Sequence, residues 1–381
     1  MDFTNVLNST YTLVLLVCLL LSFVLLCLYY GLVWMKVGLK SRKGTGNEST
    51  ELPSVSVVMV AHNEAEMLKK SLPYLLEQDY PDFEVVVVDY LSQDDTKFVL
   101  RVCKENYSCL KPISFHEDVN MFKGKKYPLS IGIKSATKDV ILLTDPDCVP
   151  SGFDWIRTMV SGYRHGVDMV LGYGMLTGGK GLLGDMQQYE NMTFSASYLG
   201  MALMGVPYAG MGRNLSYKRK FFFDQEGFIS HYSIPDGADD LFVNQNAKKE
   251  NTAVMLDYNG AVNCEARETM HQWHQDRLHR YATHRLYKPA HKMILSVYPA
   301  SQYLFLASIL WLWIGALFPW QILAAVLAVK IAWQIICAYH LAKVFKVNRV
   351  QYFSPFLELY FLITNTFLTF FALRKKNKQW R

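Results

Sequence analysis

The uncharged apolar segment at residues 11–35 constrains the fold of this chain more than any other feature. Its apolar run exceeds the ~20 residues that a helix needs to cross a bilayer. No basic residue precedes it, and the run is longer than the ~7–15 apolar residues of a cleaved signal peptide. The segment therefore predicts a helix that is retained as a membrane anchor.

Three further apolar stretches lie toward the other end, at residues 297–318, 321–342 and 357–373. Lys330 interrupts the second of these, and Glu358 lies at the start of the third, which is also the shortest. Although 51% of the residues are hydrophobic, the chain carries 39 basic and 33 acidic residues. This combination is too apolar for an ordinary soluble protein and too charged for a pure membrane bundle.

The polar residues gather between the apolar ends, in a segment long enough for one domain with its own core. We expect an N-terminal transmembrane anchor at residues 1–36 and a cytoplasmic domain at residues 50–280. Residues 281–296 mix aromatic and basic side chains, a composition that favours the headgroup layer, and predict an interfacial segment. Residues 297–381 should form C-terminal membrane helices.

Basic residues predict the orientation of the chain in the membrane. Lys36, Lys40, Arg42 and Lys43 follow the first apolar segment, whereas only Asp2 precedes it. The positive-inside rule therefore places the polar domain in the cytoplasm and the amino-terminal residues outside. We expect an integral protein of the plasma (inner) membrane.

The carboxyl-terminal region gives a mixed signal. Lys343, Lys346 and Arg349, after the third apolar segment, agree with a return to the cytoplasm. The basic residues at 374–381 do not agree, because four full spans would place them outside. Either the last segment is a re-entrant or interfacial helix, or the rule fails at this end.

The cysteines and the net charge exclude some kinds of site. The seven cysteines form no C-x-x-C pair, and a cytoplasmic domain needs no disulfide. We expect them to behave as small hydrophobic residues, without a zinc site. Much of the net charge of +6 lies beside the apolar segments, where anionic lipid is the natural partner, so nucleic acid is not expected.

Strand-like and helix-like stretches alternate in the polar domain. This alternation predicts an α/β fold with a mixed, mostly parallel sheet, flanked by transmembrane helices at both ends of the chain. The expected strands are residues 54–60, 83–89, 111–115 and 140–144, and the expected helices are residues 64–78, 94–106 and 127–136.

Polar clusters follow three of these strands, and ligands bind at such carboxyl ends in α/β sheets. The clusters are residues 61–64, residues 89–92 and the Asp145-Pro146-Asp147 motif. Two carboxylates one residue apart can share Mg²⁺ or Mn²⁺, which prefer oxygen ligands. Taken alone, Asp145-Pro146-Asp147 is equally typical of a turn that caps a strand. Three clusters at three successive strand ends favour a binding site.

Six motifs follow one another along the polar domain. They are AHNE at 61–64, VDYLSQDDT at 88–96, GKKYPLSIGI at 124–133, DPD at 145–147, GMGRNLSYKR at 210–219 and ADDLFV at 238–243. In this order they resemble the membrane-bound family 2 glycosyltransferases with a GT-A fold, and the resemblance covers about residues 53–285.

The resemblance implies transfer of a sugar from a nucleotide-sugar donor, with inversion and with a divalent cation on the diphosphate. It makes Asp147 the direct metal ligand and Asp145 a ligand of the ribose or of the metal. Asp89 resembles the carboxylate that grips the nucleobase or ribose, although Tyr90-Leu91 replaces the usual Asp-Gly beside it.

Other residues would complete the donor site. Ala61, Asn63 and Glu64 would line the nucleotide pocket, although Asn63 and Glu64 would also suit a helix cap and its first turn. Lys125 is a candidate donor contact, although a lysine on a loop is often only solvated. Arg280 could contact the diphosphate or, because it precedes a membrane segment, face lipid.

Inverting transfer also needs a base on the acceptor side. The resemblance makes Asp240 this base and Asp239 its supporting acid, while a slip of one residue reverses the two roles. An N-terminal helix cap is the simpler explanation of the pair. Gly210, Gly212, Arg213 and Asn214 resemble the family's acceptor-side loop, where glycine lets the backbone approach a sugar, although a turn without a ligand would look the same.

The acceptor is expected to be a lipid or a lipid-linked molecule. Residues 277–281 read Arg-Leu-His-Arg-Tyr where the family often has Gln-x-x-Arg-Trp, and an arginine-first variant is similar to ceramide glucosyltransferases. A processive polysaccharide synthase is the main alternative, and an inactive scaffold with this fold is a weaker one. A nucleotidyltransferase or a dehydrogenase fits less well, because no glycine-rich loop follows a strand.

Overall fold

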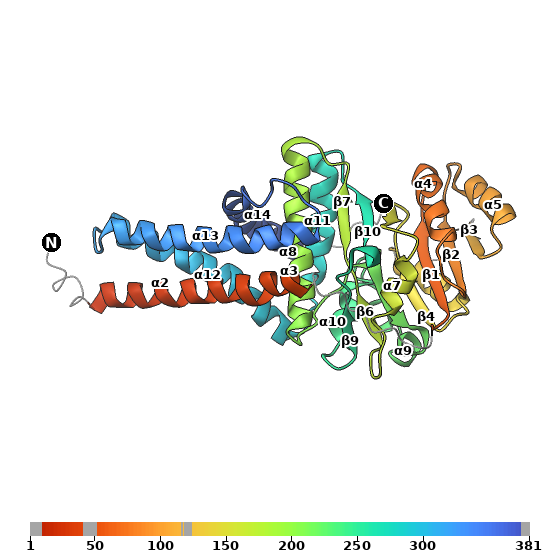
Figure 1. The fold of residues 1–381 in the computed structure, drawn as a ribbon, viewed down its shortest axis with the longest axis horizontal. Helices are drawn as coiled ribbons and strands as arrows, with labels where there is room; N and C mark the ends of the chain where they lie inside the picture. The colour runs from red at the N-terminus through yellow and green to blue at the C-terminus, as the bar shows by residue number, and fades with distance from the viewer. Residues whose placement is uncertain (1–9, 41–51, 116, 118–123, 375–381) are drawn as a thin grey trace.

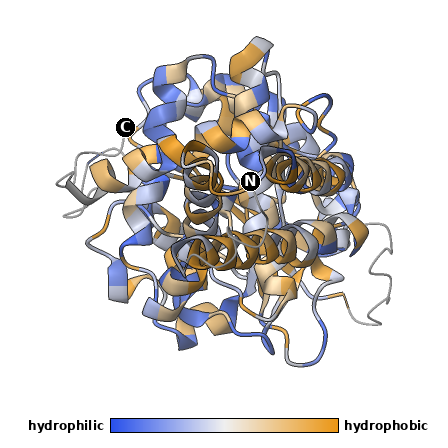
Figure 2. Cartoon of the chain, turned by 90° about the vertical axis from the view of Figure 1, so that its left-hand side faces the viewer, coloured by the Kyte–Doolittle hydropathy of each residue, from blue (hydrophilic) through white to orange (hydrophobic). Residues whose placement is uncertain are grey.

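The computed structural model describes residues 10–40, 52–115, 117 and 124–374. An α/β domain lies at one end of an elongated molecule, and α2 (Thr10–Tyr29), α12 (Pro289–Ile314) and α13 (Trp320–Val344) project from it together (Figure 1). Apolar residues dominate these projecting helices (Figure 2). Two helices, α8 (Gly181–Leu203) and α11 (Met270–His284), lie across the junction between the two parts (Figure 1).

The main sheet confirms the prediction of a mixed, mostly parallel α/β fold. Its seven strands run in the order β3-β2-β1-β4-β8-β6-β9. The first four are mutually parallel, β8 is antiparallel to both of its neighbours, and β9 is parallel to β6. The strands are β1 (Val55–Ala61), β2 (Phe83–Tyr90), β3 (Leu110–Phe115), β4 (Val140–Leu143), β6 (Met169–Leu171), β8 (Leu215–Lys218) and β9 (Thr252–Val254).

Alternation of apolar side chains along β1 explains why helices cover both faces of the sheet. Val57 and Met59 join one buried cluster with side chains of α4 (Ala65–Leu76), whereas Val58 and Val60 join another with α6 (Lys126–Ser135). A strand buried on both faces in this way is typical of parallel sheets. The remaining helices of the domain are α5 (Thr96–Asn106), α7 (Trp155–Val160), α9 (Arg219–Asp224) and α10 (Asp240–Asn246).

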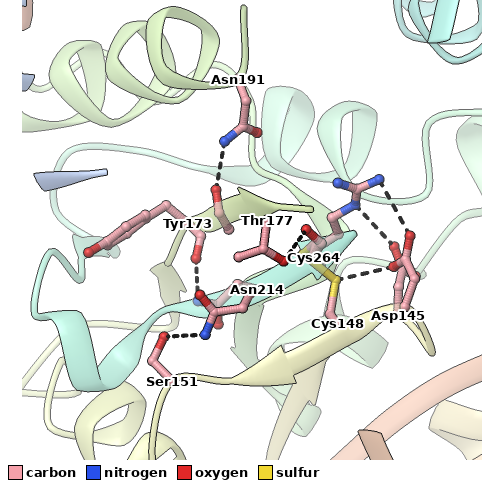
Figure 3. The surroundings of a disulfide bond; sticks show 12 residues. Asp145, Cys148, Ser151, Tyr173, Thr177, Asn191, Asn214 and Cys264 are labelled. Carbon is pink, nitrogen blue, oxygen red and sulfur yellow. Dashed lines mark hydrogen bonds and ion pairs between the residues drawn. A yellow bond between two sulfur atoms is a disulfide. The ribbon is translucent and has the colours of Figure 1, made fainter. Parts of the chain in front are cut away.

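A second, three-stranded sheet overturns the expectation that no disulfide forms. β10 (Val262–Glu265) lies between β5 (Cys148–Pro150) and β7 (Gly174–Thr177), and its register places Cys264 opposite Cys148. The two cysteines form a disulfide (Figure 3). They lie 116 residues apart in sequence, so no short motif marked the pair. The other described cysteines are free.

Three described helices are long and apolar enough to cross a membrane. The first runs continuously over Thr10–Lys40, through a π-helical turn (η1, Tyr30–Met35) into α3 (Lys36–Lys40), and the others are α12 and α13. A fourth apolar helix, α14 (Ser354–Arg374), packs against α11, α13 and α8. Residues 375–381, which contain most of the basic tail, lie outside the described residues.

The two charges that interrupt the apolar segments neutralise each other. The ammonium group of Lys330 on α13 forms a buried ion pair with the Glu358 carboxylate on α14. Tyr30 and Tyr298 donate hydrogen bonds to the other oxygen of Glu358. Because a buried charge is tolerated when it is paired and hydrogen-bonded, Lys330 and Glu358 are compatible with apolar helices.

Asn214 joins the main sheet to the elements around it. The side chain is fully buried, and its amide donates to the carbonyls of Tyr173 at 2.9 Å and Gly260 at 2.7 Å. Trp155 donates from its indole N–H to the Asn214 side-chain oxygen at 3.2 Å. One amide therefore satisfies three buried polar groups from separate segments.

We expect Asn214→Ala to lower the free energy of unfolding by about 2–4 kcal/mol, because it leaves buried carbonyl and indole groups without partners. Thermal unfolding of the purified protein should show a melting temperature lower by several degrees. Asn106→Ala is the matched control, since Asn106 is exposed and donates only to Val102 of its own helix. Equal melting temperatures for the two variants would contradict this account.

Candidate active site

The register of β1 and β2 brings the first two polar clusters together, because Ala61 pairs with Asp89. The Asn63 backbone N–H donates to the Ser92 hydroxyl at 3.0 Å, and the Gln93 N–H donates to the Asn63 side-chain oxygen at 2.7 Å. Asn63 therefore ties the two strand ends to each other. It does not cap α4: Asp94 does this by accepting the Ala65 N–H at 3.0 Å.

Backbone strain marks the same two strand ends. Asn63 has φ of 57° and Leu91 has φ of 62°, the left-handed region that side chains other than glycine rarely adopt. Leu91 stands where the family resemblance predicts glycine, and it adopts the positive φ that glycine favours. Such strain costs about 1–3 kcal/mol per residue and is concentrated at functional sites.

The Asp89 side chain provides a hydrogen-bond acceptor at this edge of the main sheet. The residue is 3% exposed, and its Oδ1 has no hydrogen-bond partner among the described residues. A buried carboxylate oxygen without a partner is costly, so it is rare unless it serves a bound molecule. The atom is suited to accept a hydrogen bond from a nucleobase N–H or a ribose hydroxyl.

Glu64 is partly buried beside the Asp145-Pro146-Asp147 motif. Its carboxylate accepts a hydrogen bond from the His62 N–H at 3.3 Å. Burial raises the pKa of Glu64 to about 7, against the opposing effect of Lys125, and Asp145 and Asp147 add to the increase. Glu64 therefore belongs to the same electrostatic cluster as the motif, although its N-cap position before α4 also suits the helix dipole.

Three cationic side chains surround the two motif carboxylates. Lys125 forms an ion pair with Asp145. The guanidinium of Arg213 lies 3.8 Å from Asp145 and 3.9 Å from Asp147, and that of Arg267 lies 3.9 Å from Asp147. Burial opposes ionisation of Asp145, but Lys125 and Arg213 outweigh it and hold the pKa of this carboxyl below its usual value.

The disulfide lies directly behind this cluster, with Asp145 beside it in Figure 3. Cys148 follows Asp147 in the chain, and the Glu265 N–H donates to the Asp147 carbonyl at 3.3 Å. The strands β5 and β10 therefore support the Asp145-Pro146-Asp147 motif. Arg267, two residues after the end of β10, contacts Asp147. The sequence analysis missed Arg267, because no motif surrounds it.

Asp145 and Asp147 could contribute two carboxylates to a divalent-cation site. Among the described residues there is no group of three or more His, Cys, Asp or Glu side chains placed to bind a metal. Asp145 and Asp147 offer oxygen ligands of the kind that Mg²⁺ and Mn²⁺ prefer, and phosphate oxygens would complete such a shell. The surrounding cations would bind the same phosphates, so the donor set fits a metal diphosphate.

The structure gives the two adjacent aspartates different surroundings. Asp239, the residue before α10, is partly exposed, and its Oδ2 accepts the Gly212 N–H at 2.6 Å. Asp240 is 7% exposed, and Thr283 and Tyr287 donate their hydroxyls to its Oδ2. Burial, followed by the charge of Asp239, raises the pKa of Asp240 to about 7. Asp239, at the N-cap of α10, makes no side-chain cap hydrogen bond, whereas Asp240 Oδ1 accepts the Leu241 N–H.

The residues of the expected acceptor-side loop have different surroundings. Gly212 lies against Asp239, where a Cβ atom would come within 3.1 Å of the Asp239 carboxylate. Arg213 faces the carboxylates of the Asp145-Pro146-Asp147 motif instead. Gly210 packs against Val243 and other apolar side chains, and Asn214 is buried in the scaffold. Only Gly212 therefore lies against the aspartate pair.

Arg280 makes its contacts away from the motif carboxylates. Its guanidinium lies 3.4 Å from Glu190 of α8 and over the ring of Phe194. Arg277, fully buried on the same helix, forms a second ion pair with Glu190 at 3.1 Å, and Trp273 donates to Glu190 at 2.8 Å. These contacts fasten α11 to α8, and a role for Arg280 at the diphosphate stays a prediction.

The raised pKa values of Asp240 and Glu64 predict how stability depends on pH. Both values are about 7 in the folded chain, against about 4 in an unfolded one. The native state therefore holds more protons between these values, and the free energy of unfolding falls as pH rises from about 4 to about 7. Each group contributes at most about 1.4 kcal/mol per pH unit.

Denaturant unfolding of the solubilised protein across this range checks the prediction. Asp240→Asn should flatten the pH dependence, since the amide cannot titrate and can still accept from Thr283 and Tyr287. Asp224→Asn, at an exposed position, should leave the dependence unchanged. A wild-type protein that becomes more stable between pH 4 and pH 7, with Asp240→Asn unchanged, would contradict the assignment.

Comparison with known proteins agrees with this geometry. Residues 56–223 match the family model for glycosyl transferase family 2. The chain is similar to the glycosyltransferase AglE of Haloferax volcanii, with 33% identity over 127 residues that cover 32% of this chain and 40% of the relative. It is also similar to the poly-beta-1,6-N-acetyl-D-glucosamine synthase of Staphylococcus epidermidis, with 26% identity over 103 residues, 27% of this chain and 24% of the relative.

The aligned region thus spans less than half the length of either of these curated relatives. A solved structure resembles the chain over a greater share: the mannosyltransferase PcManGT from Pyrobaculum calidifontis, in complex with GDP-Man and Mn²⁺. The likeness covers 92% of this chain and 98% of that one, with a TM-score of 0.57 and 19% identity, and shows a common fold. Residues 56–223 therefore lie in a family 2 glycosyltransferase domain on a GT-A fold.

Proposed function

We propose that this chain is an inverting, metal-dependent glycosyltransferase that moves a sugar from a nucleotide-sugar donor to a lipid or lipid-linked acceptor. The observation that carries the proposal is the link between two sites through one short turn. Gly212 binds the Asp239 carboxylate, and the next residue, Arg213, faces Asp145 and Asp147. A diphosphate site and a candidate base are therefore held next to each other.

The donor would lie along the carboxyl edge of β1, β2 and β4. Asp89 would accept a hydrogen bond from the nucleoside, and Asn63, Glu64 and the backbone of Ala61 would line the same pocket. Asp145 and Asp147 would hold Mg²⁺ or Mn²⁺, as the Mn²⁺ and GDP-Man bound to the structural neighbour suggest by analogy. Such an ion offsets the charge that develops on the leaving diphosphate.

The cationic side chains would then change partners when the donor binds. Lys125, Arg213 and Arg267 are paired with the motif carboxylates. Phosphate oxygens carry the charge and the geometry that ammonium and guanidinium groups prefer. These three residues are therefore proposed as diphosphate ligands, and Arg267 is an addition to the set expected from the sequence.

For the base, the surroundings favour Asp239 over Asp240. A base must reach the hydroxyl that it deprotonates, and Asp239 is the partly exposed member of the pair. Asp240 is enclosed, with its Oδ2 occupied by Thr283 and Tyr287 and its Oδ1 by the Leu241 N–H. We therefore exchange the roles expected from the sequence, so that Asp239 is the base and Asp240 holds α10 against α11.

A lipid acceptor follows from the position of the domain. α8 and α11 lie between the α/β domain and the three long apolar helices (Figure 1). With these helices in the plasma (inner) membrane, the active site would stand at the cytoplasmic face, where a lipid could present its hydroxyl. The division into residues 1–36, 50–280, 281–296 and 297–381 belongs to this proposal, although α11 crosses the boundary at 280.

Processive polymer synthesis is the second candidate, because one relative is a poly-beta-1,6-N-acetyl-D-glucosamine synthase. The two functions differ in their products. Membranes containing the protein are incubated with a panel of labelled nucleotide sugars and Mn²⁺, and then extracted for lipid. Label in one discrete lipid supports single transfer, whereas a ladder of products supports a polymerase. No transferred label with any donor, from protein shown to bind nucleotide, would contradict both.

Asp239→Asn should lower kcat in this assay by about 10²- to 10⁴-fold, the usual contribution of a general base. Its donor KM should change little, because Asp239 contacts the acceptor side. Asp240→Asn should lower kcat less, since the amide can keep both hydroxyl contacts. A severe loss for Asp240→Asn with a mild one for Asp239→Asn would restore the original assignment of roles.

Asp89→Ala should weaken binding of the nucleotide sugar by about tenfold or more, because a hydrogen bond to a charged group is worth about 1.5–3 kcal/mol. Titration calorimetry with Mn²⁺ present measures this affinity directly. Asp168→Ala is a suitable control, since Asp168 pairs only with Lys218 on the domain surface. Unchanged affinity for Asp89→Ala would remove this residue from the donor site.

A further inference from the structure

The first half of α14 has one buried and one exposed face, and its second half is largely exposed. The buried face contains Leu357, Glu358, Phe361 and Leu362. The exposed residues are mostly apolar, with Thr366 and Thr369 among them. The large apolar ones are Phe356, Leu359, Ile363, Phe367, Phe370 and Phe371.

The buried face of α14 carries the polar contacts of the helix. Glu358 is paired with Lys330 of α13 and bound by Tyr30 and Tyr298. Farther along the helix, Arg277 of α11 donates to the side chains of Thr364 and Asn365. The protein itself therefore covers the charged and amide groups of α14, and the surface that faces outward is mostly apolar.

The neighbours of α14 place it at the base of the projecting helices. Phe361 stacks on Tyr189 of α8 and packs edge-on against Trp273 of α11. In Figure 1, α14 lies beside α8 and α11, which cross the junction, and it does not run outward alongside α2, α12 and α13. α14 therefore lies near the ends of the three membrane helices that join the α/β domain.

From this arrangement we infer that α14 is an in-plane membrane helix and not a fourth span. Its Phe, Leu and Ile side chains rest on the acyl chains of the leaflet nearest the α/β domain, just below the headgroups. Phe and Leu are typical of the apolar face of helices that lie at this depth. The inference rests on the membrane anchoring assumed in the proposed function.

The charges of the chain agree with three spans. With three spans, all three groups of basic residues would lie on the side of the α/β domain: those after α3, those after α13 and those that begin at Arg374. With four, the last group would lie on the opposite side, against the positive-inside rule. An in-plane α14 therefore removes the conflict that the sequence alone left open.

Epitope tags at three places in the full chain test this topology. The tags stand before residue 1, within residues 41–51, and after residue 381, and antibody access is measured in sealed vesicles before and after detergent. We expect the second and third tags on one side and the first on the other. A third tag on the side of the first would show that α14 spans, and would leave the anchor intact.

First and second tags on the same side would overturn both the anchoring and the position of α14. A paired substitution gives an independent measurement. Phe367→Lys should reduce the carbonate-resistant yield of the protein less than twofold, because a lysine near the headgroups can extend its ammonium group into water. Ile336→Lys, at an exposed site in the interior of α13, should reduce it by about tenfold. Equal losses would contradict the in-plane helix.

Discussion

Charge balance at the carboxyl edge of the parallel sheet is the constraint on which the rest of the site depends. The carboxylates of Glu64, Asp145 and Asp147 influence one another there, and Lys125 is attracted by Glu64, Asp145 and Asp239. Packed together alone, carboxylates would repel and take up protons. Lys125, Arg213 and Arg267 lie among them and offset this repulsion. The elements that deliver these cations are far apart in sequence, so folding of the whole domain assembles the site.

α11 connects that edge to α8 and α14, which pack against the long apolar helix α13. Thr283, in its last turn, binds the buried carboxylate of Asp240. Arg277, at its middle, binds Glu190 of α8 and side chains of α14. Since the capping box at Thr269 and Gln272 fixes the beginning of the helix, both ends are held. α11, whose end overlaps the segment 281–296, therefore couples the α/β domain to the long apolar helices.

Much of the architecture was predictable from local patterns. Apolar runs followed by polar clusters marked β1, β2 and β4, because a strand buried on both faces leaves a clear signal. The order of the motifs then placed Asp89, Asp145 and Asp147 at one edge. The short strands β6, β8 and β9 were not predicted, since three or four residues carry too little periodicity. β8 also reverses direction within the sheet, and only tertiary pairing determines this.

The residues that the sequence misplaced or missed share a physical cause. Asn214 looked like a ligand-binding residue beside glycines, yet its polar groups serve three buried partners. Arg267 and the Cys148–Cys264 disulfide depend on the pairing of β5 with β10, across 116 residues. Adjacent aspartates cannot be told apart by spacing, whereas burial distinguishes Asp239 from Asp240. Long-range pairing and burial are properties that short motifs do not encode.

The ion pair between Lys330 and Glu358 also limits how this chain can change over evolutionary time. Replacing either residue alone leaves one buried charge without its partner, at a cost of about 3–5 kcal/mol. Replacing both with apolar residues of similar size is often neutral or stabilising. Single substitutions at Lys330 or Glu358 are therefore disfavoured, whereas the double substitution is not. The two positions should covary among descendants of this chain, present as a charged pair or absent together.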